Sequence, residues 1–179
     1  MDRKAELEKA FREDDEDSLL RAAREGSPRV VRFLCSRLSS PEEAVRQKSV
    51  RSLGVVLSQP AMVPRDKVRD LLRRFFWALN DESGAVPFGV PEAIGEVLAV
   101  RPELQPDYLP LLCSLAYHRD VVQTGIIERG VFWALGRVGQ AVALNSPEAV
   151  REVSRAAQDH PDPETRRAAA WALGRIGAS

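Results

Sequence analysis

Side chains suited to catalysis are few in this chain and lie far apart. His118 follows a helical pattern at its end, where an imidazole interacts favourably with the helix dipole, and His160 precedes a proline turn. Neither stands at a spacing that would form an acid–base pair, a nucleophile with its base or a phosphate-binding loop. We interpret both histidines as capping residues, and we expect no catalytic residue and no enzymatic activity.

The two cysteines also argue against a chemical role. Cys35 and Cys113 each fall within an apolar helical pattern and are distant from any CxxC motif or Cys/His cluster. We therefore expect two buried free thiols in a reducing compartment, with no metal site and no cofactor.

A motif of arginine and tryptophan is better suited to binding than to reaction. It occurs twice, with successive members four positions apart, so its three side chains share one face of a helix. Guanidinium groups pair with carboxylates or phosphates, and tryptophan offers a flat apolar surface. The two copies are Arg129, Trp133 and Arg137, and Arg167, Trp171 and Arg175.

The elements that carry this motif form an internal repeat. Its anchors are Gly54, Gly95, Gly136 and Gly174, which are separated by 41, 41 and 38 residues. A large aliphatic residue precedes each glycine, and a small residue lies two positions before it. A period near 40 residues is typical of a solenoid built from pairs of helices.

Leucine, alanine, arginine and glutamate recur at helical spacing almost everywhere, and no run alternates as a strand would. Capping residues followed by proline mark several helix starts, for example Ser27-Pro28 and Ser40-Pro41. We expect a single domain over 1–179, with a capping hairpin at 1–26 that carries an acidic stretch. The expected repeats span about 27–60, 61–101, 102–141 and 142–179. The expected helices span 3–12, 16–25, 28–38, 41–57, 65–79, 91–100, 106–118, 124–140, 147–159 and 163–176.

Two segments carry a family resemblance. The residues Glu164-Thr-Arg-Arg-Ala-Ala-Ala-Trp-Ala-Leu-Gly-Arg-Ile-Gly177 and Arg129-Gly-Val-Phe-Trp-Ala-Leu-Gly-Arg-Val-Gly139 resemble the short HEAT repeats of the bilin-lyase type. The segment Asn80–Gly95 also resembles an uncharacterised group of HEAT-like proteins from anaerobic sulfate- and metal-reducing bacteria. The resemblance implies an all-α fold: an α-solenoid with a right-handed superhelix, made of about four HEAT-like hairpins and the N-terminal cap. It implies an interaction fold without implying lyase activity.

The stripe opposite the core side of each second helix is the candidate binding face. It lies seven and three positions before each anchor glycine and one position after it, and in the second repeat it holds Phe88, Glu92 and Glu96. The alternative interpretation is that the tryptophans pack on the adjacent repeat while the arginines form bridges to Glu92, Glu96, Glu128 or Glu164.

A loop is expected where the second repeat departs from the pattern. Pro87, Gly89 and Pro91 prevent a helix from starting before residue 91. The loop over 80–90 carries Asp81, Glu82 and Phe88, and it is either a specific contact or a tolerated defect in the repeat.

The leading functional hypothesis is a non-enzymatic scaffold or adaptor that binds another protein. The 26 basic and 26 acidic side chains cancel, which argues against nucleic acid, although HEAT-like DNA glycosylases bind it in a comparable groove. The remaining alternative is a lyase or chaperone for a protein-bound chromophore or cofactor. Without a signal peptide or a membrane span, we expect a cytoplasmic protein, and end-to-end self-association of the stack stays open.

Overall fold

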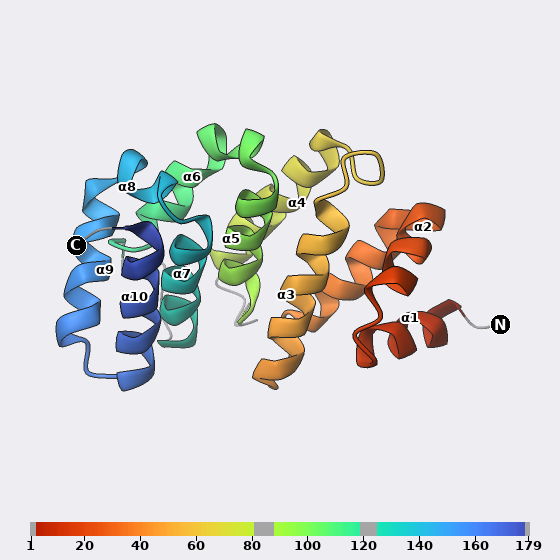
Figure 1. Ribbon diagram of the computed structural model, residues 1–179, viewed down its shortest axis with the longest axis horizontal. Helices are drawn as coiled ribbons and strands as arrows, with labels where there is room; N and C mark the ends of the chain where they lie inside the picture. The colour runs from red at the N-terminus through yellow and green to blue at the C-terminus, as the bar shows by residue number, and fades with distance from the viewer. Residues whose placement is uncertain (1–2, 81–87, 119–124, 178–179) are drawn as a thin grey trace.

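The computed structural model describes residues 3–80, 88–118 and 125–177, and within them the chain is a stack of helices (Figure 1). Both ends of the described chain lie at opposite ends of the long axis. No helix in these ranges is long and apolar enough to cross a membrane. The helices are α1 (Arg3–Arg12), α2 (Glu16–Arg37), α3 (Glu43–Leu57), α4 (Arg65–Leu79), α5 (Val90–Val100), α6 (Gln105–Ser114), α7 (Gly125–Val138), α8 (Ala141–Asn145), α9 (Pro147–Asp159) and α10 (Pro163–Ile176), with a 3₁₀ turn, η1, at Pro102–Leu104.

The helices form two layers, as the repeat predicts for an all-α solenoid. The second helices of the hairpins, α3, α5, α7 and α10, stand side by side in that order (Figure 1). The first helices, α2, α4, α6 and α9, form the other layer, and α1 packs against α2 as a cap. The core lies between the layers, where Leu53, Ile94 and Leu135, the residues that precede the first three anchor glycines, are fully buried. Leu173, before the fourth, is only partly buried.

The anchor glycines allow the second helices to approach one another closely. A Cβ atom on Gly95 would lie 2.5 Å from the Cα atom of Ala134, and one on Gly136 would lie 2.8 Å from the Cα atom of Ala172. Gly54 likewise leaves room for the Glu96 side chain. Gly174, on the last helix, has nothing within 4 Å of the corresponding point. The first three glycines are therefore needed for packing, and the fourth is not.

Several predicted helix boundaries are correct, and others are wrong for local reasons. The bounds of α1, α4, α9 and α10 are as predicted. The expected break between 25 and 28 is present: Gly26 has a non-helical backbone (φ −176°, ψ 72°), so α2 consists of two helical segments that meet at a kink there. The Ser27 hydroxyl, just after the kink, donates to the Met62 carbonyl at 2.8 Å. Helix α3 begins at Glu43, so the expected start at 41 was wrong. The short elements η1 and α8 were not predicted.

Candidate functional site

We call the stripe positions of α3, α5, α7 and α10 the second-helix face. They differ in exposure: Arg51 and Arg175 are exposed, whereas Glu92 and Glu96 are buried. Two tryptophans of this face stack on each other. The rings of Trp133 on α7 and Trp171 on α10 have centroids 5.9 Å apart and planes 12° apart. Trp171 also sits against Gly136, where a Cβ atom would come within 2.5 Å of its ring. Even so, 42% of Trp171 is exposed. The two tryptophans thus pack between repeats, and Trp171 still has a large solvent-exposed surface.

The arginines of this face have different partners. Arg137 forms a two-fold bridge to Glu96 on α5, with Nε 2.7 Å from Oε2 and Nη2 3.1 Å from Oε1. Arg167 pairs with Glu164 in its own helix. Within the described ranges, no ion pair engages Arg129 or Arg175, and Arg175 is exposed. Glu96 and Arg137 hold two repeats together, whereas Arg175 is exposed and has no ion pair with another described residue.

Glu92 is the most unusual member of the face. It is only 8% exposed, and its Oε2 atom has no hydrogen-bond partner in the described part of the chain. The carboxyl group lies against Gly130 of α7, where a Cβ atom would be 2.5 Å from Oε2. Burial raises the pKa of Glu92 to about 7; Arg46 and Arg129 oppose this rise and Glu43 adds to it. Glu92 is therefore a buried carboxyl that changes charge near neutral pH.

The described end of the predicted loop packs onto the first hairpin. The Phe88 ring lies under the guanidinium of Arg46, 5.5 Å from centroid to Cζ, and the Gly89 amide donates to the Leu38 carbonyl at 2.9 Å. Helix α5 begins at Val90, one residue before the predicted start. Asp81 and Glu82 lie outside the described residues, so their role stays a prediction.

Two polar residues connect successive hairpins: Arg101, which the sequence did not single out, and His160. Arg101 is 3% exposed, and its Nη1 donates to the carbonyls of Leu57 at 3.1 Å and Val63 at 3.0 Å. His160, expected to be a cap, does end α9, and its Nε2 also lies 3.1 Å from the Glu128 carboxylate on α7. Both residues are structural bridges, and no spacing in the sequence distinguishes Arg101 from the exposed arginines.

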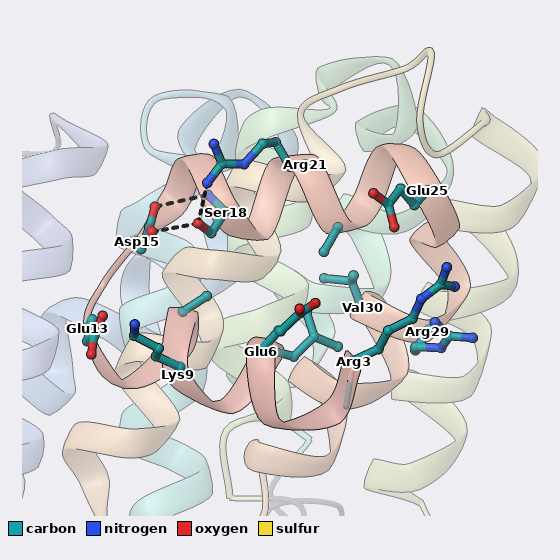
Figure 2. A pocket seen from close by; sticks show the side chains of 13 residues that line it. Arg3, Glu6, Lys9, Glu13, Asp15, Ser18, Arg21, Glu25, Arg29 and Val30 are labelled. Atoms are coloured by element: carbon teal, nitrogen blue, oxygen red, sulfur yellow. Dashed lines mark hydrogen bonds between the residues drawn. The ribbon is translucent and has the colours of Figure 1, made fainter. Parts of the chain in front are cut away.

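A groove of about 400 Å³ lies away from this face, between α1 and α2 (Figure 2). Its rim mixes both signs of charge, and one end is occupied by the capping network of α2, in which the Ser18 hydroxyl donates to Asp15 at 2.6 Å and accepts from Arg21 at 2.6 Å. The rim residues are Arg3, Lys9, Arg21 and Arg29 with Glu6, Glu13, Asp15 and Glu25. Such balanced charge selects no particular ligand. No group of residues suited to a metal ion occurs in the described ranges.

Comparisons with known proteins agree with this architecture. Residues 126–179 match the family model of HEAT repeats, which covers α7 to α10 almost completely. An uncharacterised protein of Archaeoglobus fulgidus is 28% identical over 148 residues, which cover 80% of this chain and 73% of that protein. No solved structure matches.

The repeat, the two-layer fold and the family match together support a HEAT-like repeat protein. Proteins of this class commonly serve as scaffolds for protein interactions. The archaeal relative does not bear on the resemblance to the bacterial group.

Proposed function

We propose that this protein is a non-enzymatic scaffold that binds another protein through the second-helix face. The observation that carries the proposal is the half-exposed ring of Trp171, which is fixed by stacking on Trp133. Tryptophan and arginine dominate the binding energy of protein interfaces. An aromatic ring that is already immobile loses little conformational entropy when a partner binds. Trp171 is thus suited to anchor a partner.

The charges around this anchor indicate the chemistry of the partner. Arg167 and Arg175 lie one turn before and one turn after Trp171 on α10, and both are exposed. Arg129 lies on the neighbouring helix, one turn before Trp133. An apolar side chain of the partner would cover the Trp171 ring, and flanking carboxylates would pair with the arginines. Glu92 and Glu96 of α5, both largely buried, and Phe88 just before that helix belong to the proposed face. Asp81 and Glu82 are proposed contacts on the strength of the sequence alone.

A pull-down with a matched control tests this proposal. Wild-type protein is compared with a Trp171→Ala, Arg175→Glu variant, which alters the face, and with a Trp77→Ala, Arg73→Glu variant on α4. Trp77 is 70% exposed in the other layer, against 42% for Trp171, so the control removes the same type of side chain from a more exposed position and reverses one charge, as the face variant does. Helical circular dichroism establishes that all three are folded.

We expect partners that bind the wild-type and control proteins and that are lost from the face variant. If both variants retain the same partners, the second-helix face is not the docking surface. If nuclease treatment removes the captured material, nucleic acid is the ligand and the scaffold proposal fails.

A further inference from the structure

A second groove, of about 490 Å³, lies between α2 and α4 in the layer opposite the second-helix face. Its floor is apolar: Val31 and Cys35 come from α2, Leu71 comes from α4, and Leu57 and Val63 close it from beneath. Leu57, Val63 and Leu71 are buried, whereas Val31 and Cys35 are only partly covered. A cavity of 300–1,000 Å³ with a mostly apolar lining is typical of small-molecule sites.

The rim of this α2–α4 groove has an excess of positive charge. Arg32 and Arg74 are exposed, and neither takes part in an ion pair within the described ranges. Lys67 lies 3.6 Å from Asp66, but both side chains are about two-thirds exposed, so this pair is weak. The acid on the rim, Asp70, is engaged by Arg73 at 3.1 Å. The groove therefore presents two unpaired guanidinium groups above an apolar floor.

Arg74 lies close enough to the floor to affect its thiol. Burial raises the pKa of Cys35 to about 11, and the charge of Arg74 acts against this rise. Cys35 is consequently a neutral and weakly reactive group at physiological pH, so it serves the groove as apolar lining. A ligand seated on the floor would cover Cys35 and bring its polar end within reach of Arg74.

We propose that the α2–α4 groove binds an amphiphilic anion, a small molecule with an apolar chain and a carboxylate head group. The chain lies on Val31, Cys35 and Leu71, and the carboxylate pairs with Arg32 and Arg74. The part of α2 that lines the groove, residues 27–35, spans about 12 Å at 1.5 Å per residue, which sets the length of chain that can be buried. The groove between α1 and α2 lacks this selectivity because its charges balance.

Calorimetric titration with dodecanoate tests the proposal, with dodecyltrimethylammonium as a probe that has the same chain and the opposite charge. The groove variant is Arg32→Glu, Arg74→Glu. The control variant is Arg24→Glu, Arg51→Glu, which reverses two other exposed arginines outside the groove. We expect dodecanoate to bind wild-type and control proteins alike, and the groove variant roughly tenfold more weakly or worse. Equal binding of the two probes, or equal binding by the two variants, would overturn the proposal.

Alkylation of Cys35 locates the bound molecule. Cys113 is 1% exposed, so Cys35 is the accessible thiol, and its modification by iodoacetamide at pH 9 can be followed by mass spectrometry. Saturating dodecanoate should slow this alkylation several-fold, whereas dodecyltrimethylammonium should not. An unchanged rate in the presence of bound dodecanoate would place the molecule elsewhere and refute the assignment.

Discussion

Replacing Glu92 with glutamine should stabilise the protein at alkaline pH and have little effect at acidic pH. The side chain is buried, and its Oε2 atom lacks a partner in the described part of the chain, so ionisation in the folded state is unfavourable. The pKa is about 7 in the folded protein and 4.5 in an exposed glutamate. Below pH 4.5 the carboxyl group is neutral in both the folded and the unfolded protein, so its ionisation does not reduce the stability of the fold.

The magnitude follows from linkage between protonation and folding. As the pH rises from 4.5 to 7, the unfolded state loses its proton before the folded state does, so wild-type stability falls. At about 1.4 kcal/mol for each unit of pKa, the total loss is about 3 kcal/mol, and it is complete above pH 7. Glutamine has no such titration, so the difference between the two proteins grows over this window and then stays constant.

Urea denaturation of both proteins at pH 4.5, 5.5, 7 and 8.5 measures this difference. Other carboxyl groups titrate in both proteins, so the comparison isolates Glu92. Glu16→Gln, an exposed substitution on α2, is the control and should change the unfolding free energy by less than about 0.5 kcal/mol at every pH. A difference between wild type and Glu92→Gln that does not vary with pH would refute the reasoning.

Two further predictions concern packing and capping. Gly95→Ala should lower the free energy of unfolding by about 1–3 kcal/mol, because the new Cβ atom would meet the Ala134 backbone. Gly174→Ala, at the same repeat position, should raise it by up to about 1 kcal/mol, because alanine has the higher helix propensity. Thermal denaturation should move in opposite directions for the two, and a loss of stability in both would contradict the packing account. Ser146→Ala removes the hydroxyl that accepts from the Ala149 amide at 3.1 Å at the start of α9 and should cost about 1 kcal/mol in urea denaturation. An unchanged midpoint would show that water replaces this cap.

The sequence pattern predicts which side of a helix is buried, but it does not predict how deeply the neighbouring helices pack. Leu53, Ile94 and Leu135 are buried because their offset from glycine fixes their direction. Glu92 and Trp171 occupy one repeat position, yet they are 8% and 42% exposed. Helix α5 lies between α3 and α7, whereas α10 is covered on one side only in the described chain. The difference arises from neighbours in space, which no local pattern contains.

Local signals predict where a helix is interrupted, but they do not predict the distant partners of its polar groups. The break expected before Pro28 is present at Gly26, yet the Ser27 hydroxyl binds the carbonyl of Met62, 35 residues away. Arg101 is buried by carbonyl groups of another hairpin. Both contacts join residues far apart in sequence, so they become apparent only once the hairpins are stacked.

The close contacts at two anchor glycines, Gly95 and Gly136, fix the distance between the second helices that they join. At Gly95 and Gly136 the second helices touch backbone to backbone and cannot be compressed further. Bending of the stack at these two contacts must therefore open or narrow the spaces between the first helices of the same hairpins, α4, α6 and α9. At the α3–α5 contact, nearer the groove between α2 and α4, Gly54 faces the side chain of Glu96 and no backbone atom, so the spacing of these two helices is set by a side chain.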